Sequence, residues 1–156
     1  MEIRPAAPAD ALAVAGVHVR AWQTAYRDLL PAAYLDSLRP EDRAARYTFG
    51  RSDGPRTTVA VLDGAVVGFA TIHGAELCAL HVDPDAWRRG VGSALIARAR
   101  ADLAAAGIAE AQLWLLDGNT RAAAFYARDG WTPSGTERTD TVWGAEVHER
   151  EFRRRL

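Results

Sequence analysis

The sequence predicts an α+β protein whose mixed, mostly antiparallel sheet has six to seven strands and is flanked by helices. Two stretches indicate this class. Residues 57–73 alternate between apolar and polar side chains on either side of Asp63-Gly64, a dipeptide typical of an antiparallel hairpin turn. Residues 76–116 then show the pattern strand, helix, strand, a connection that makes the two strands parallel. We expect the whole chain, 1–156, to form a single domain.

The N-terminal third is expected to be mainly helical after a brief extended start. Pro8 precedes a helical pattern over 9–28, in which His18 and Trp22 share one face. Pro31 ends this helix, because proline cannot continue the backbone hydrogen-bond pattern. Two short helices are expected next, over 33–37 and 41–49, before a loop over 50–56.

The central region supplies most of the predicted sheet. Strands over 57–63 and 65–73 form the hairpin, and a third strand over 76–82 is expected to pair antiparallel with it. A helix over 91–106 and a strand over 110–116 follow.

The C-terminal region is expected to contain one helix and a final pair of strands. Asn119 or Thr120 caps the helix, since both side chains can accept a hydrogen bond from a free N–H group of the first turn. A strand over 131–140 is interrupted by Pro133 and Gly135. The last strand, over 142–153, places four side chains on one face: Glu146, His148, Arg150 and Phe152.

Composition and charge exclude several classes of protein. Hydrophobic residues make up 49% of the chain and charged residues 25%, which is ordinary for a globular protein. The net charge of -1 argues against a nucleic-acid or membrane-surface partner. One cysteine, Cys78, excludes an internal disulfide and favours a cytoplasmic location; it is interpreted as a small buried side chain rather than a nucleophile.

The turn between the strand over 76–82 and the following helix is suited to phosphate groups. It contains Arg88-Arg89-Gly90-Val91-Gly92-Ser93, in which two glycines allow backbone N–H groups to approach a ligand. The helix start adds unpaired N–H groups and a partial positive charge. No Gly-Lys-Ser/Thr of a P-loop is present, and Leu95 occupies the third glycine position of a dinucleotide fingerprint.

The same turn resembles the pyrophosphate-binding motif of the GNAT superfamily, the acetyl-CoA-dependent N-acetyltransferases. Val82-Asp83-Pro84 is followed by Trp87-Arg88-Arg89-Gly90-Val91-Gly92, against the family pattern Gln/Arg-x-x-Gly-x-Gly/Ala. Trp87 departs from the usual Gln/Arg. Further along, Asn119 to Phe125-Tyr126 is similar to the family's Asn-x-x-Ala-x-x-Phe-Tyr. The resemblance implies a GNAT fold with a splayed central parallel strand pair, acetyl-CoA as the acetyl donor, and no metal.

The resemblance also implies roles for individual residues. Tyr126 would protonate the leaving thiolate, and a phenol with an ordinary pKa near 10 is still protonated at neutral pH. Asn119 would form a hydrogen bond with the cofactor, a role compatible with capping the helix because the side-chain amide has four hydrogen-bonding positions. The residues expected to bind the cofactor are Leu80, His81, Val82, Arg88, Arg89, Gly90, Val91, Gly92, Ser93, Asn119 and Tyr126.

The sequence indicates the general base and the residues of the acceptor pocket less clearly. Glu76 begins the central strand and is the first candidate general base; a water molecule is an alternative, as are Glu146 and His148 on the last strand. Trp22 and Tyr26 are expected in the wall of the acceptor pocket.

The function expected from these features is direct transfer of an acetyl group from acetyl-CoA to a primary amine of a small molecule or peptide. One alternative is a GNAT-fold module that binds acyl-CoA as a sensor without useful turnover, and another is a different nucleotide-binding domain. The sequence does not identify the acceptor amine or show whether other acyl-CoAs are used. The resemblance is compatible with a homodimer.

Overall fold

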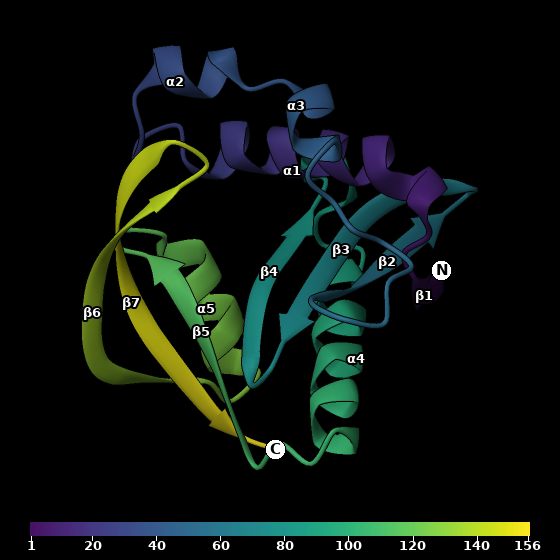
Figure 1. The fold of residues 1–156 in the computed structure, drawn as a ribbon. Helices are drawn as coiled ribbons and strands as arrows, with labels where there is room; N and C mark the ends of the chain where they lie inside the picture. Colours follow the sequence, from purple (N-terminus) through teal and green to yellow (C-terminus); the bar gives the residue numbers. More distant parts are fainter.

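The computed structural model describes residues 1–156 as one seven-stranded sheet with the strand order β1-β2-β3-β4-β5-β7-β6. Helices cover both of its faces (Figure 1). The strands are β1 (Glu2–Pro5), β2 (Arg56–Leu62), β3 (Ala65–His73), β4 (Glu76–Val82), β5 (Glu110–Leu116), β6 (Thr132–Val142) and β7 (Ala145–Arg155). The helices are α1 (Ala11–Ala25), α2 (Ala32–Ser37), α3 (Pro40–Ala44), α4 (Val91–Ala105) and α5 (Thr120–Arg128), with 3-10 turns η1 (Pro8–Asp10) and η2 (Pro84–Ala86).

The strand directions confirm the predicted mixed sheet. β2 and β3 form an antiparallel hairpin around Asp63 and Gly64, both of which have positive φ angles. β3 pairs antiparallel with β4, and β5 with β7, so β4 and β5 are the only parallel neighbours. The predicted α+β class and the splayed central pair are therefore confirmed.

The two parallel strands separate soon after they meet. Only Glu76 and Gln112 are paired across β4 and β5, and the strands diverge from that end toward α1 (Figure 1). A bulge in β4 accompanies the separation: Leu77 pairs with Ile72 and Ala79 with Thr71, which leaves Cys78 as the extra residue. The β5-facing edge of β4 beyond Glu76 therefore keeps free backbone hydrogen-bonding groups.

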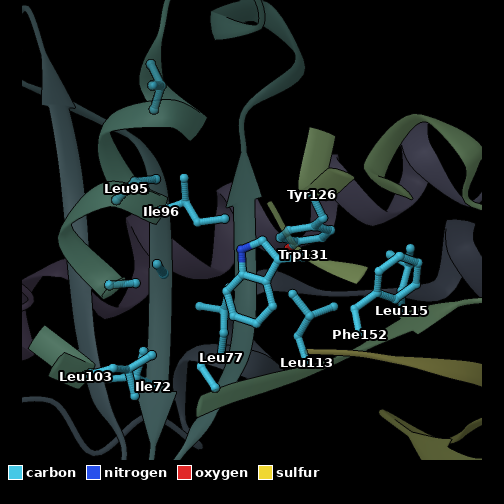
Figure 2. Packing of buried hydrophobic residues seen from close by; sticks show 14 of the residues in the cluster. Ile72, Leu77, Leu95, Ile96, Leu103, Leu113, Leu115, Tyr126, Trp131 and Phe152 are labelled. Carbon is cyan, nitrogen blue, oxygen red and sulfur yellow. The ribbon is translucent and has the colours of Figure 1, made fainter. Parts of the chain in front are cut away.

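The main core lies between the sheet and the helices α4 and α5. Leu95 and Ile96 of α4 meet Leu77 of β4 and Leu113 of β5 in one cluster of buried side chains (Figure 2). Trp131 is in the same cluster, just after α5, and is only 1% exposed. The helix of the strand-helix-strand unit therefore packs against both of its strands.

Four elements differ from their predicted bounds. α1 ends at Ala25 rather than at residue 28, because the chain turns at Tyr26, whose carbonyl accepts from the N–H groups of Leu29 and Leu30. β7 begins at Ala145 rather than at Val142, because β6 extends to Val142.

α3 ends at Ala44 rather than Phe49, because Tyr47 and Phe49 stack on each other at 4.7 Å and pack against the core between α1 and the sheet. β6 continues through Pro133 to Val142, since its register shifts between Pro133 and Glu137 and an edge strand tolerates proline. The turn before β7 is consequently Trp143-Gly144, both with positive φ.

None of the five helices combines the length and the hydropathy that crossing a lipid bilayer would require.

Candidate active site

A cavity of about 970 Å³ occupies the region where β4 and β5 separate. Residues from α1, β4, β5, α5 and β7 line it, together with the start of α4. Its wall includes Tyr126 and Glu76, the first catalytic candidates from the sequence, and Trp22 and Tyr26, the acceptor-binding candidates. The cofactor-binding candidates in its wall are Leu80, His81, Val82, Arg88, Gly90, Val91, Gly92, Ser93, Asn119 and Tyr126.

One end of the cavity is a cradle of free backbone donors. The first N–H group of α4 with a backbone partner belongs to Ala94, which donates to the Gly90 carbonyl over 3.0 Å. The six preceding N–H groups, of residues 88–93, have no backbone acceptor. Arg88 and Gly90 both have positive φ, which turns the chain sharply into the helix. Converging N–H groups at a helix N-terminus form a site for an anion such as a diphosphate.

Arg121 of α5 adds a positive charge to this end that the sequence analysis missed. The Trp87 indole N–H donates to the Val82 carbonyl over 2.9 Å, and the Arg121 guanidinium lies 3.2 Å from the centre of the Trp87 ring. Burial and the nearby charge of Arg88 lower the pKa of Arg121. Trp87, which departs from the family pattern, thus positions an arginine beside the cradle. Only the place of Arg121 in the first turn of α5 could have indicated this role.

Arg89 lies outside the predicted cofactor site, whereas Gly92 lies in the cavity wall and has a second, structural role. Arg89 is absent from the cavity wall, and its guanidinium lies 4.0 Å from the Asp63 carboxylate. A Cβ atom added at Gly92 would lie 3.3 Å from the Phe125 ring. Gly92 therefore also allows α5 to pack closely against the start of α4.

Tyr126 lies on α5 in the cavity wall and is 8% exposed. Its ring meets Phe125 and Trp131 edge-on, with ring centres 5.3 and 6.1 Å away. Burial raises the pKa of its hydroxyl, and Tyr26 and Asp129 add to the effect. The phenol is therefore protonated at neutral pH, as a general acid must be. Asn119, at the N-terminus of the same helix, accepts from the Ala122 N–H over 3.2 Å and confirms the predicted cap.

Two carboxylates line the cavity, and one of them was not predicted. Glu76 lies at the end where β4 and β5 pair, and Glu149 reaches the same cavity from β7. Burial raises the pKa of Glu149 and the charge of Glu76 adds to the shift, although Arg138, 3.0 Å away, opposes it. The alternation of buried Ala145 and Val147 along β7 is the signal that could have identified Glu149.

The other acid-base candidates have different surroundings. Glu146 and His148 are exposed and are absent from the cavity wall. Cys78 was expected to be buried but is exposed, because the bulge turns it out of the core. Neighbouring groups nonetheless partly desolvate the Cys78 thiol. This desolvation and the charge of Glu76 raise the pKa of the thiol to about 11, which disfavours the nucleophilic thiolate.

A pair of stacked histidines lies on the α1 side of the cavity. His18 and His81 have ring centres 4.7 Å apart, and His18 Nδ1 lies 3.1 Å from the Tyr47 hydroxyl. Burial lowers the pKa of His81 to about 4 and also lowers that of His18; Arg43 contributes to both shifts. Both rings are therefore neutral at pH 7.

Acid is expected to destabilise the protein through this pair. A histidine pKa below its unfolded value near 6.5 means that the unfolded chain binds the proton more tightly, so stability is lost as pH falls from about 6.5 toward 4. Between about pH 7 and pH 5, His81 should account for a loss of about 1–2 kcal/mol in the free energy of unfolding. Urea denaturation at both pH values measures it. A His81→Phe variant should lose less stability on acidification than the parent; an equal loss would contradict the assignment.

Arg121 is expected to strengthen anion binding at the cradle. Replacing it with alanine should weaken CoA binding about three- to tenfold at low ionic strength and less at high salt, because salt screens the interaction. Calorimetry at two salt concentrations measures this effect. Arg89→Ala is the matched control, because Arg89 points toward Asp63 rather than into the cavity. Equal losses for both variants would contradict a specific role for Arg121.

Together, the split sheet and the free N–H cradle at α4 define an open mixed-sheet α+β protein with a site for an anionic ligand. A model of the acetyltransferase (GNAT) family matches residues 19–131, well over half of the chain. The chain therefore belongs to the acetyltransferase (GNAT) family.

Similar proteins agree with this assignment. An uncharacterized N-acetyltransferase of Bacillus subtilis, YuaI, is 27% identical over 128 residues, which cover 75% of this chain and 72% of the relative. A crystal structure of a GCN5-related N-acetyltransferase from Rhodopseudomonas palustris superposes with a TM-score of 0.79 at 26% identity, covering 99% of this chain and 95% of that chain. The PaiA N-acetyltransferase from Thermoplasma acidophilum, solved in complex with coenzyme A, shares the fold: its TM-score is 0.74 at 20% identity, covering 99% and 98% of the two chains.

Proposed function

We propose that this protein transfers the acetyl group of acetyl-CoA directly to a primary amine. The observation that carries the proposal is the continuity of one cavity from the N–H cradle at 88–93, along the free edge of β4, to the Tyr126 side chain. The cradle suits the diphosphate, and the backbone of Leu80 to Val82 offers strand-like hydrogen bonds to the pantetheine amides. The residues present therefore fit both the diphosphate and the pantetheine arm of acetyl-CoA.

The side chains in the cavity can carry the proton transfers of the reaction. A carboxylate, Glu76 or Glu149, accepts a proton from the acceptor ammonium, directly or through water. The amine nitrogen then adds to the acetyl carbon and forms a tetrahedral oxyanion. The oxyanion collapses to the amide as the carbon–sulfur bond breaks, and the nitrogen loses its second proton to solvent. Tyr126 donates its hydroxyl proton to the departing thiolate and later recovers one from solvent. A backbone N–H group near the β4 bulge stabilises the oxyanion.

Thiol release from acetyl-CoA in the presence of an amine panel tests this function. The panel contains polyamines, amino acids, aminoglycosides and peptides with free N-termini. We expect amine-dependent thiol release and a matching N-acetylated product detected by mass spectrometry. Tight acetyl-CoA binding without turnover on any amine would instead support a sensor module. If the protein does not bind acetyl-CoA at all, the proposed cofactor site is wrong.

Conservative variants can show which of the two carboxylates is the general base. Glu76→Gln and Glu149→Gln each remove one charge and keep the shape of the side chain. The variant of the general base should lower kcat/KM most below about pH 7, where an unassisted amine is almost fully protonated. Glu146→Gln is the matched control, because Glu146 is exposed and outside the cavity wall. If water alone is the base, neither cavity variant should change the pH profile.

A further inference from the structure

An ion pair between Arg138 and Glu149 lies in the wall of the cavity. The two residues are opposite each other on β6 and β7, and the Arg138 Nε–H donates to Glu149 Oε1 over 3.0 Å. Among the ion pairs of the chain, this is the only one in which both partners line the cavity. The pair is therefore placed where it can act on a ligand as well as join two strands.

Arg138 is fixed by three neighbours. Its guanidinium carbon lies 4.1 Å from the centre of the Trp114 ring of β5. Besides the bond to Glu149, its Nη2 atom lies 3.3 Å from Asp140 Oδ2 on β6. A guanidinium that is stacked on an aromatic ring and paired with two carboxylates has little freedom to move, so it also fixes the carboxylate of Glu149.

The other oxygen of Glu149 remains available to a ligand. Glu149 Oε2 accepts no hydrogen bond, and it is not among the four buried side-chain atoms that lack a partner. The side chain as a whole is only 12% exposed and lines the cavity. Glu149 therefore has one oxygen held by Arg138 and one that is accessible, and it presents a fixed negative charge to the cavity.

Glu149 lies at the open end of the split sheet, away from Glu76. On β5, Leu116 pairs with Glu149, whereas Gln112 pairs with Glu76 at the junction with β4. The four residues between these two levels correspond to about 13 Å along the strand. The two carboxylates of the cavity can therefore have different roles.

Tyr26 supplies a second accessible oxygen near Glu149. Burial raises the pKa of its hydroxyl to about 12, and the charge of Glu149 adds to the shift, so the two groups interact across the cavity that both line. The hydroxyl is not among the buried side-chain atoms that lack a partner. The Tyr26 ring also meets Trp22 edge-on, with ring centres 5.1 Å apart. A carboxylate, a phenol oxygen and aromatic rings together are complementary to an ammonium group, which has three N–H donors.

We propose that Glu149 and Tyr26 bind the ammonium group of the acceptor, and that Arg138 is a positioning residue that holds Glu149 in the orientation this requires. The inference rests on the proposed function, because the ammonium belongs to the acceptor of that reaction. It leaves removal of the proton to Glu76 or to water.

The first test measures kcat and KM for the best acceptor of the amine panel at saturating acetyl-CoA. Glu149→Gln should raise KM for the amine at least about tenfold and leave kcat within about threefold, because it removes a charge that contacts the ammonium in the bound state. Tyr26→Phe should raise KM about two- to fivefold, since a neutral hydrogen bond contributes less than a charged one. An unchanged KM in Glu149→Gln overturns the binding role. A lower kcat at unchanged KM also overturns it, because Glu149 would then be the general base.

The pH profile reports whether Arg138 positions and charges Glu149. Arg138 opposes the raised pKa of Glu149, so Arg138→Gln should raise KM at least about threefold and move the acid limb of kcat/KM to higher pH by about one unit. Arg138→Lys keeps the charge and should return the limb to within about half a unit of the parent. The other charged groups near Glu149 are the same in all these variants: Asp140, Glu76, and the Asp117, Glu137, His148 and Arg150 side chains of an adjoining polar hollow of about 300 Å³.

A double variant shows whether Arg138 acts through Glu149. Adding Arg138→Gln to Glu149→Gln should raise KM by no more than about twofold, because the positioned carboxylate is already absent. Arg98→Gln is the matched control: its side chain is 40% exposed, against 37% for Arg138, and its guanidinium lies 2.9 Å from Asp102, outside the cavity wall. That variant should change neither KM nor the pH profile.

The outcomes separate this inference from the proposed function. Melting temperature and CoA affinity of each variant should stay near those of the parent; if Arg138→Gln does not fold, Arg138→Met keeps an apolar chain over Trp114 and replaces it. Independent, multiplying losses in the double variant would make Arg138 a purely structural residue and overturn its positioning role. Absence of turnover on every amine overturns the proposed function and the inference together. Turnover with a KM and a pH profile that do not respond to Glu149 and Arg138 overturns the inference alone.

Discussion

Replacing Tyr126 with phenylalanine is expected to lower kcat about 10²- to 10⁴-fold, the usual effect of removing a general acid. The phenol lies in the wall of the cavity, and burial raises its pKa, so that it is protonated when the thiolate departs. The thiolate forms in the same buried site, where desolvation raises its basicity as well, so the phenol can pass it a proton as the carbon–sulfur bond breaks. The substitution keeps the ring, so the contacts with Phe125 and Trp131 should remain.

Three measurements on the same Tyr126→Phe variant decide between its roles. Single-turnover rates report the chemical step even where product release limits kcat. Calorimetry reports acetyl-CoA affinity, which should stay within a few-fold of the parent, and the melting temperature reports packing. A single-turnover rate within about threefold of the parent would show that another group protonates the thiolate.

Replacing Trp131 with alanine is expected to lower the free energy of unfolding by about 3–5 kcal/mol. The indole is 1% exposed, lies between the α5 side of the core and the sheet (Figure 2), and donates to Asp129 over 3.0 Å. Its removal deletes a large apolar area and leaves a cavity that the rigid sheet cannot fill.

Urea denaturation measures this loss through the midpoint and slope of the transition. Leu12→Ala is the control, because Leu12 is an apolar residue of α1 that is 56% exposed. That variant should stay within about 0.5 kcal/mol of the parent. A comparably small change for Trp131→Ala would mean that the core between α5 and β7 relaxes around the missing ring.

Much of the fold could be predicted from the sequence because its signals are local. Asp63-Gly64 specifies a hairpin by its own backbone preferences, and Asn119 caps α5 by a hydrogen bond to a residue three positions later. The bounds of β3, β4 and β5 follow from runs of apolar residues in the same way. β6 was less predictable, because its continuation through Pro133 depends on its place at the sheet edge.

The candidate site was most readily predicted where its residues belong to one continuous motif. The turn at 88–93 forms its cradle from neighbouring backbone groups. Glu149, Arg121 and Arg43 reach the cavity from three separate elements, and nothing in their flanking residues reports that convergence. The stack of Arg121 on Trp87 brings together α5 and the turn after β4, which are more than thirty positions apart.

The single pairing between Glu76 and Gln112 makes the sheet two leaves joined at one corner. One leaf contains β1 to β4, and the other contains β5, β7 and β6. Acetyl-CoA lying along β4 would form backbone hydrogen bonds that β4 lacks on the side facing β5. The bound cofactor would then connect the two leaves of the sheet as well as react, and the leaves would be held together along their length only while it is bound. Amide hydrogen exchange along Ala79 to Val82 would report that continuity as slower exchange on binding acetyl-CoA.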